Sequence, residues 1–238
     1  MKLNVLVIAS HPDDAELSCS GTIAVLISKG YKVGLLDLTR GELGTRGTPD
    51  TRALEADEAS KILQLSIREN AGLEDGFFQP TRENLIHVAV FIRQYRPDIV
   101  LTNAIDDRHP DHGRGSRLVV DACFISGLTK VTSKLNGQLQ SAWRPKAVYH
   151  YIQSKYIVPD IIVDISDFWE VKLASIRAFR SQFFDPGSKE PETYISQPQF
   201  LKFIEARCLQ WGHAIGVNYG EGFTVDRHIG VKNLLDLI

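Results

Sequence analysis

The chain has 238 residues, of which 43% are hydrophobic and 24% are charged, proportions that are ordinary for one large globular domain. Its 27 basic and 29 acidic residues give a net charge of −2 without any long basic run, which argues against nucleic acid or an anionic membrane as a partner. The three cysteines show no paired spacing, and neither a secretory signal nor a transmembrane stretch is recognisable, so we expect a cytoplasmic protein without disulfides.

Short apolar runs in the first two thirds of the chain predict strands. Runs rich in Val, Ile and Leu suit strands that are buried on both faces of a parallel sheet. Three such runs occupy residues 4–9, 32–38 and 98–102, and a weaker one occupies residues 67–71.

Helical patterns lie between these runs, over residues 21–29, 51–63 and 82–95. The second of them has Asp50 or Thr51 as a plausible N-cap. Strands that alternate with helices in this way predict an open, mostly parallel α/β sheet with right-handed crossovers.

The last third of the chain is less regular. Its apolar pattern predicts strands over residues 147–152 and 161–163, helices over 166–179 and 198–213, and a loop with a short terminal strand over 216–227. The polar residues 129–141 are expected to form a long surface loop.

Four polar segments fall where predicted strands end or where loops follow. They are HPDD (residues 11–14), TRGELGTRGTPDTR (39–52), DDRHPDHGRG (106–115) and ETYIS (192–196). In an open α/β sheet, ligands bind outside the carboxyl ends of the strands. We therefore expect the first three segments to open onto one crevice.

The first and third segments contain residues that suit a metal site. His11, Asp14 and His112 offer two imidazoles and one carboxylate, which is a zinc-type donor set that leaves a fourth position for water. Alone, HPDD would fit surface histidines and an Asx-turn equally well. The second cluster, RHPDH, on another strand-end loop favours the metal site.

Residues beside these ligands suit acid–base chemistry. Asp13 is a natural general base, although it could instead cap the following helix. His109 could act as a general acid or polarise a carbonyl group, with Asp111 or another carboxylate orienting its ring. We assign no role to the other histidines, which are His87, His150, His213 and His228.

Three further side chains are candidates for substrate contacts. The glycine-rich segment before Arg52 lacks both nucleotide-binding patterns, so a phosphate loop is not favoured. Arg52 and Arg108 could bind an anionic or hydroxyl-rich substrate through their bidentate guanidinium groups. Alternatively, they could form ion pairs with Asp50, Glu55 or Asp106. Tyr194 could place a phenol near a developing oxyanion.

These residues resemble the PIG-L (LmbE-like) family of zinc-dependent N-deacetylases. The shared pattern is an apolar strand followed by HPDDAE, then SGTIA, then TRGELGTRG with Arg52 and Glu55, and finally RHPDH. It is clearest over residues 2–120. Residues 36–47, DRHPDH and NYGEGF (218–223) are most similar to the bacterial deacetylases of bacillithiol biosynthesis, which act on N-acetylglucosaminyl malate. The segment ELSCSG departs from the Gly-Gly pair of many members.

The resemblance implies a Rossmann-like, three-layer α/β/α fold in a single domain over residues 1–238. Residues 1–128 would form the core with the metal site, and residues 129–238 would shape the substrate pocket and the oligomer interface. The family branch often forms hexamers, so we expect a homo-oligomer.

The resemblance also implies roles for individual residues. It implies one Zn²⁺ per subunit, with Fe²⁺ as an alternative ion in the cell, held by His11, Asp14 and His112. Asp13 would be the general base, and His109, supported by Asp111, would be the acid or electrophile. The substrate contacts would be Arg52, Arg108 and Tyr194.

We therefore expect a zinc-dependent hydrolase that removes the acetyl group from an N-acetylglucosaminyl conjugate, with N-acetyl-α-D-glucosaminyl L-malate as the leading candidate. One alternative is a deacetylase for chitooligosaccharides, a mycothiol-type precursor or an antibiotic intermediate. Another is a non-catalytic sugar-binding module, although all the expected ligands and the base are present.

Overall fold

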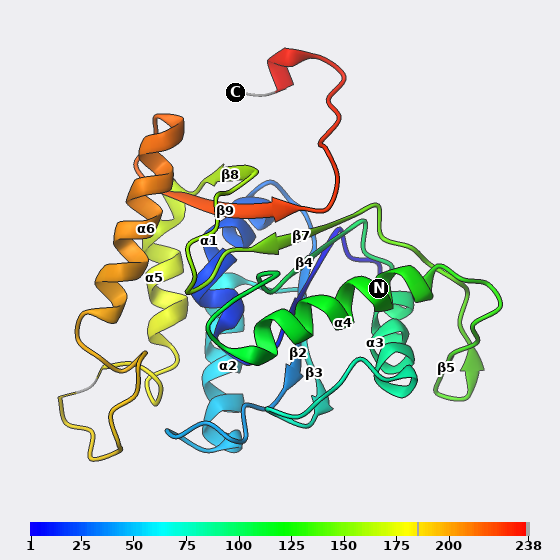
Figure 1. Cartoon of the computed structure of the whole chain (residues 1–238), viewed down its shortest axis with the longest axis horizontal. Coiled ribbons are helices and arrows are strands. Elements are labelled where there is room, and N and C mark those ends of the chain that lie inside the picture. The colour runs from blue at the N-terminus through cyan, green and yellow to red at the C-terminus, as the bar shows by residue number, and fades with distance from the viewer. Residues whose placement is uncertain (185, 237–238) are drawn as a thin grey trace.

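The computed structural model describes residues 1–184 and 186–236, and within this part the main sheet has seven strands. Their order is β3-β2-β1-β4-β7-β9-β8 (Figure 1). The strands are β1 (Val5–Ala9), β2 (Val33–Thr39), β3 (Ile67–Leu73), β4 (Ile99–Thr102), β7 (Ala147–Tyr151), β8 (Ile161–Asp164) and β9 (Gly220–Val225). Strands β3 to β7 run parallel in this order, whereas β9 is antiparallel to both neighbours. The prediction of a mostly parallel α/β sheet is confirmed.

Helices cover both faces of the sheet and give it three layers (Figure 1). They are α1 (Asp14–Ser28), α2 (Pro49–Leu63), α3 (Arg82–Tyr95), α4 (Pro110–Ser126), α5 (Trp169–Arg177) and α6 (Phe200–Ile215). Leu6 and Ile8 of β1 pack with α3 and α4 on one face, while Val5 and Val7 pack with α1 on the other. Every residue of β1 and β2 is consequently buried, as expected for strands that are covered on both sides.

Helix α1 begins at Asp14, seven residues before the predicted start at residue 21, so this prediction was wrong at its N-terminal end. The early turns contain Glu16, Ser18 and Ser20, which the apolar pattern excluded from a helix. All three are buried because β9 and α5 also pack against α1. Helix α1 therefore starts directly at the HPDD segment.

Other predicted bounds also differ: the helix predicted over residues 198–213 is α6 (Phe200–Ile215), and α2 begins at Pro49 rather than at residue 51. The N-cap of α2 is Thr48, whose hydroxyl accepts a hydrogen bond from the backbone N–H of Thr51 at 3.1 Å. The helix predicted over residues 166–179 is the shorter α5, preceded by a 3-10 turn, η1 (Ser166–Phe168). The loop at residues 129–141 contains a two-stranded hairpin, β5 (Lys134–Leu135) and β6 (Gln138–Leu139).

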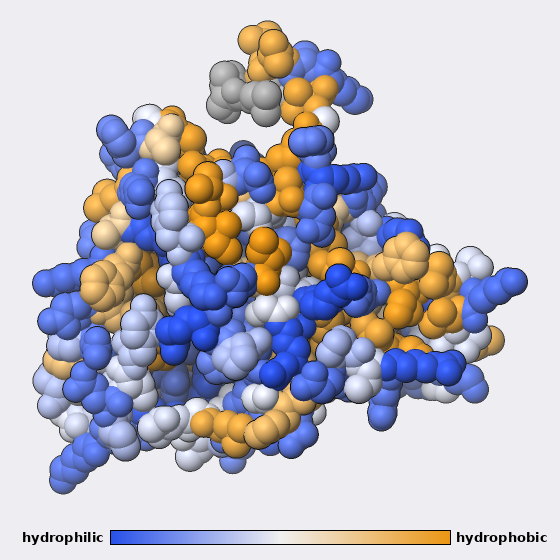
Figure 2. Space-filling view, viewed as in Figure 1, coloured by the Kyte–Doolittle hydropathy of each residue, from blue (hydrophilic) through white to orange (hydrophobic). Residues whose placement is uncertain are grey.

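A C-terminal segment follows β9 and projects from the body of the protein (Figure 1). Its last described element is η2 (Leu234–Asp236), and hydrophobic side chains are visible on this segment (Figure 2). The exposed apolar residues of this segment are Ile229, Val231, Leu234 and Leu235. In the described part of the chain, none of the helices has both the length and the apolar character needed to cross a membrane.

Helix α4 approaches β1 closely at Gly115, which leads to a first prediction. A Cβ atom at this position would lie 3.3 Å from Cδ1 of Leu38 and would overlap the Ser10 hydroxyl, which donates to the Asp111 carbonyl. Gly115→Ala should therefore lower the free energy of unfolding by about 1–3 kcal/mol, as measured by urea denaturation. The exposed neighbour Arg117→Ala should change it by less than about 0.5 kcal/mol, and equal effects would contradict the close approach.

Candidate metal centre and active site

The HPDD and RHPDH segments meet between β1 and β4, where the order of the strands in the sheet reverses direction. Strands β1 and β4 are neighbours, but α1 and α4, which follow them, lie on opposite faces of the sheet. A crevice opens at the carboxyl ends of two strands when their connections diverge in this way. The fold thus brings residues about 100 positions apart in the sequence to one place.

A cavity of about 710 Å³ occupies this crevice. All four polar segments contribute to its lining, including ETYIS, in which the sequence predicts Tyr194 as a candidate substrate contact. The predicted site residues that line it are His11, Asp13, Asp14, Arg52, Arg108, His109, His112 and Tyr194. Asp111 is fully buried behind them.

The Asp14 carboxylate lies between the two predicted histidine ligands. Its Oδ1 is 3.0 Å from Nε2 of His112, and its Oδ2 is 3.4 Å from Nδ1 of His11. The side-chain amides of Asn103 and Gln153 also donate to it, each at 3.0 Å. Burial alone would raise the pKa of Asp14, but His112 and His11 outweigh burial and hold this pKa well below its usual value.

The outer nitrogen of each histidine faces a further carboxylate. Nε2 of His11 is 3.0 Å from Asp75 and 3.3 Å from Asp111, while Nδ1 of His112 is 2.6 Å from Asp107. Burial lowers the pKa of His112, yet the carboxylates of Asp14 and Asp107 raise it overall to about 9. A histidine that binds a metal through one nitrogen commonly donates its other N–H to a carboxylate, as both rings are placed to do here.

The spacing of these atoms fits a divalent ion. Neighbouring ligand atoms around a tetrahedral zinc ion, each about 2.0–2.1 Å from it, are roughly 3.3 Å apart. The 3.4 Å from Nδ1 of His11 to Oδ2 of Asp14 and the 3.0 Å from Nε2 of His112 to Oδ1 of Asp14 are each close to this value, and they end on different oxygens of the carboxylate. With one donor atom taken from each residue, the trios of described residues whose donor atoms all lie within 4.8 Å of one another are His11, His109 and His112, and His11, Asp75 and Asp111; the trio with Asp14 is not among them.

Asp13 occupies a strained position next to this group. Its φ of 107° lies in the left-handed region, which costs a residue other than glycine of order 1–3 kcal/mol. It stands at the N-cap position of α1, but its side chain forms no capping hydrogen bond. Burial raises the pKa of Asp13 to about 7, with the Arg52 guanidinium lowering it and the Asp14 carboxylate raising it. A carboxyl group with a pKa near neutrality is suited to accept a proton.

Arg52 forms its ion pair with Asp13, through Nη2 at 2.9 Å from Oδ2. The same guanidinium contacts the backbone carbonyls of Pro12 and Gly41. The three carboxylates considered as its partners from sequence contact other residues. Asp50 binds Arg40, Glu55 binds Ser181 and Asp106 binds Lys155.

His109 begins α4 as its N-cap, and its ring stacks on that of His112 with 5.1 Å between centroids. Nδ1 of His109 accepts a hydrogen bond from the backbone N–H of Asp111 at 3.2 Å, so in the neutral ring Nε2 carries the proton. Burial, followed by the proximity of His11 and His112, lowers the pKa of His109. This ring is therefore suited to donate a hydrogen bond while uncharged.

The expected support of His109 by the Asp111 carboxylate differs from what the structure shows. That carboxylate accepts from the Gly76 backbone at 2.8 Å and from Arg114 at 2.6 Å, and it faces His11. Its Oδ2 lies 3.3 Å from Nε2 of His11, which belongs to the loop after β1. Asp111 contacts His109 only through the backbone N–H among the described interactions.

Arg108 and Tyr194 lie together at the exposed rim of the cavity. The guanidinium carbon of Arg108 is 4.4 Å from the centroid of the Tyr194 ring, and Tyr194 is 42% exposed. Tyr194 also packs edge-on against Phe200 of α6. The described ion pairs include none with Arg108, so its charge remains available to a ligand.

Comparison with known proteins identifies the family. The family model PIG-L, described as GlcNAc-PI de-N-acetylase, matches residues 6–123. The diacetylchitobiose deacetylase of Thermococcus kodakarensis is 31% identical over 232 residues, which cover 92% of this chain and 81% of the relative. The chain belongs to the PIG-L family.

Two further similarities extend this comparison. The conserved protein TT1542 from Thermus thermophilus has 36% identity and a TM-score of 0.86, and the match covers 96% of this chain and 97% of that one. A protein of Bacillus cereus named probable N-acetyl-alpha-D-glucosaminyl L-malate deacetylase 2 is 25% identical over 195 residues, covering 76% of this chain and 84% of the relative. The similarity to solved structures thus extends over nearly the whole chain, beyond the residues 6–123 that the family model matches.

Several members of the site were missed by sequence reasoning. Asp75 follows β3, Asn103 follows β4, and Gln153 follows β7, so the strand-end rule could have found all three. Asp107 stands just before RHPDH in the same loop. Arg207 lies on α6, donates to the Gln153 carbonyl and lines the cavity, and nothing in its local sequence indicates this.

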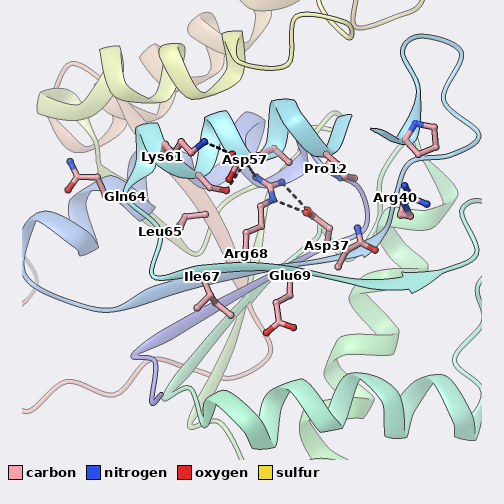
Figure 3. A pocket seen from close by; sticks show the side chains of 15 residues that line it. Pro12, Asp37, Arg40, Asp57, Lys61, Gln64, Leu65, Ile67, Arg68 and Glu69 are labelled. Atoms are coloured by element: carbon pink, nitrogen blue, oxygen red, sulfur yellow. Dashed lines mark hydrogen bonds and ion pairs between the residues drawn. The ribbon is translucent and has the colours of Figure 1, made fainter. Parts of the chain in front are cut away.

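A second cavity, of about 650 Å³, lies between α2 and β3 (Figure 3). Arg68 points into it and forms hydrogen bonds at 2.8 and 3.1 Å to Asp37 and at 2.6 Å to Glu16. Arg68 is thus paired with two carboxylates, and no histidine or cysteine is among the described residues that line this cavity. We therefore place the functional site in the first cavity.

Metal binding in the first cavity should compete with protons, which gives a second prediction. His11 and His112 must lose protons to bind a metal, and both pKa values are raised, that of His112 to about 9. The affinity for zinc, measured by competition with a chelator, should therefore rise at least about tenfold per pH unit from pH 6 to 8. The exposed His213→Gln control should retain this dependence, whereas an affinity independent of pH would contradict the assignment.

Proposed function

We propose that this PIG-L family protein is a zinc-dependent N-deacetylase that hydrolyses the acetamide group of an N-acetylated amino-sugar conjugate. The observation that carries the proposal is the Asp13 carboxyl group, whose pKa is raised to about 7, beside His11, Asp14 and His112 in one cavity. Two similar proteins, named as deacetylases of diacetylchitobiose and of an N-acetylglucosaminyl malate, support the same reaction class.

In this proposal His11, Asp14 and His112 hold the metal ion. Asp14 is the preferred third ligand because it contacts both histidines, while Asp75 and Asp111 face the outer nitrogen of His11. A bound zinc ion supplies Lewis-acid chemistry, because it acidifies water to a pKa of about 7 and polarises carbonyl groups. Fe²⁺ suits the same nitrogen and oxygen donors, and its availability in the cell would decide which ion is used.

The residues of this chain then perform the proton transfers. Asp13 accepts a proton from the water that attacks the acetyl carbon, and Arg52 keeps its carboxylate oriented. His109 donates from Nε2 to the acetyl oxygen as negative charge develops, an interaction that typically contributes about 10²–10³ to the rate. Asp13 returns the proton to the amine nitrogen, so that the C–N bond breaks and acetate and the free amino sugar leave. We place Tyr194 as a further donor at the rim.

For the substrate we propose N-acetyl-α-D-glucosaminyl L-malate, as in bacillithiol biosynthesis. Arg108 and Arg207 line the cavity and form no ion pair within the described residues, so they could bind malate carboxylates. Diacetylchitobiose is the second candidate, because the Thermococcus kodakarensis relative has the higher identity. Diacetylchitobiose is uncharged, so its binding would not require the positive charges of Arg108 and Arg207. Direct contact of Arg52 with substrate stays a prediction, since the structure pairs it with Asp13.

The family resemblance supports the remaining parts of the proposal. We place the enzyme in the cytoplasm as a homo-oligomer, with a hexamer expected, and its partner is a small molecule rather than nucleic acid or a membrane. Residues 1–128 supply the metal ligands, and residues 129–238 shape the substrate end of the cavity, with Tyr194 and Arg207 in its lining.

A third prediction tests this function directly. The purified, zinc-loaded protein should release acetate from N-acetylglucosaminyl malate, lose this activity on chelation and regain it with zinc. Asp13→Asn should bind zinc but lower kcat by about 10²–10⁴, because it removes the proton acceptor. Acetate and metal content are both measured.

The comparison substrate is N,N'-diacetylchitobiose. Faster turnover of the malate conjugate supports the first substrate, and the reverse result supports the second. If the zinc-loaded protein releases acetate from neither of these nor from a wider panel of N-acetyl sugars, the N-deacetylase assignment is wrong.

A fourth prediction concerns the pH profile. Arg52 lowers the pKa of Asp13, so Arg52→Gln should raise that pKa. Because Asp13 acts as a base only when deprotonated, activity declines as pH falls through its pKa. The acid limb of kcat/KM should therefore move to higher pH in Arg52→Gln. In Arg40→Gln, which loses only an exposed ion pair with Asp50, the limb should stay in place. An unmoved limb in Arg52→Gln would show that Asp13 is not the titrating base.

A further inference from the structure

Helix α1, which begins with the catalytic segment, is broken at Cys19. This residue has φ −142° and ψ 15°, values outside the helical region, and it is completely buried. The break separates a short first segment, residues 14–18, from the longer second segment, residues 20–28. The first segment starts with Asp14 and directly follows Asp13, so its direction determines where both carboxylates lie.

A buried ion pair occupies the break. Nζ of Lys172, on α5, lies 2.8 Å from Oε1 of Glu221, on β9, and the two side chains are 0% and 1% exposed. Lys172 donates to the carbonyl oxygens of Glu16 at 3.2 Å and Leu17 at 2.9 Å. Glu221 accepts from the backbone N–H groups of Gly21 at 3.0 Å and Thr22 at 2.7 Å.

The ion pair takes the place of a helical hydrogen bond. In an unbroken α-helix the N–H of Gly21 would donate to the carbonyl of Leu17, four residues earlier. Here Leu17 accepts from Lys172 and Gly21 donates to Glu221, so the pair is inserted between the two groups. A side chain that inserts into the helical hydrogen-bond ladder is a recognised cause of a sharp kink.

The charges have the signs that the two helix ends require. The carbonyl end of a helix segment attracts a cation, and the N–H end attracts an anion. Lys172 is at the carbonyl end of the first segment, and Glu221 is at the N–H end of the second. A buried ion pair is tolerated when its remaining donors and acceptors are satisfied, and these backbone contacts satisfy them.

Two other contacts hold the segments at this angle. A Cβ atom on Gly21 would lie 2.7 Å from Cδ1 of Ile165, so the second segment can approach Ile165 only with glycine here. On the first segment, Glu16 pairs with Arg68 at 2.6 Å. The first segment is thus fixed by buried charges on two sides while it carries the strained Asp13.

We propose that Lys172 and Glu221 are positioning residues for the active site, which keep α1 broken so that Asp13 and Asp14 reach their places in the cavity. Neither residue lines the cavity that holds the predicted ligands. When both charges are removed, Gly21 can bond directly to Leu17, the helix straightens, and Asp14 moves away from His11 and His112. The kinetic part of this inference rests on the proposed function, but its metal-binding part does not.

The test is a double-mutant cycle on the full chain, with Lys172→Met, Glu221→Met and the double variant. Each single variant leaves one charge buried without its partner and should lower the melting temperature markedly. The double variant should recover most of that loss, because the helix can close its own hydrogen bonds. Its zinc affinity and kcat should nevertheless remain about 10–100-fold below those of the wild type, with KM little changed. The Arg180→Met control removes an exposed ion pair with Glu58 and should alter none of these values.

The absorption spectrum of the cobalt-substituted double variant provides a second readout, because it reports the coordination geometry independently of activity. A changed spectrum with recovered stability supports positioning. Recovery of wild-type zinc affinity and spectrum together with stability would overturn the proposal, since the pair would then be purely structural. If the wild type hydrolyses no N-acetyl sugar, the proposed function fails, but the affinity and spectral comparisons still decide this inference.

Discussion

The burial of the Asp14 carboxylate is the constraint from which the rest of the site follows. A carboxylate that is only 3% exposed must be stabilised by nearby positive charge, and here His11 and His112 supply it. Those rings are buried too, so each needs a carboxylate on its other side. The outer carboxylates are in turn held by backbone N–H groups of Leu43, Gly76 and Lys155 and by the Arg114 guanidinium. Each buried charge is therefore stabilised by groups of opposite polarity one step farther from Asp14. These contacts fix the positions of Asp14, His11 and His112 before any ligand binds.

Asp13 and Asp14 show how neighbouring groups of one chemical kind acquire different roles. Asp14 faces two imidazole rings, which hold its pKa low and keep it an anion. Asp13 is buried with a single guanidinium beside it, and its pKa is raised to about 7. One residue is thus suited to bind a cation permanently and the other to exchange a proton. Two carboxyl groups whose environments drive their pKa values apart are typical of acid–base sites.

The parts of the fold that sequence predicts well are those that one local pattern determines. The apolar runs of β1 and β2 indicate strands covered on both faces, and the site segments were found because they follow strands. The start of α1 was missed because its buried residues are polar: Glu16 is stabilised by Arg68, 52 positions away, which no local pattern can reveal. The partner of Arg52 was missed for the same reason, since Asp13 lies 39 positions away in the sequence. Arg207 comes from a helix whose position depends on the whole of the last third.

The antiparallel strand β9 comes late in the sequence, so the contacts that it makes with α1 can form only after most of the chain has been synthesised. The hydrogen bonds that complete the metal-binding loop span 139 residues, from Gln153 to Asp14, and the contact between Glu221 and Gly21 spans 200. Contacts between such distant parts of a chain close slowly, because the loop entropy must be lost before they form. A nascent chain on the ribosome therefore carries His11 and Asp14 long before it has the partners that organise them. The contacts that organise the site can thus form only when nearly the whole chain has been synthesised.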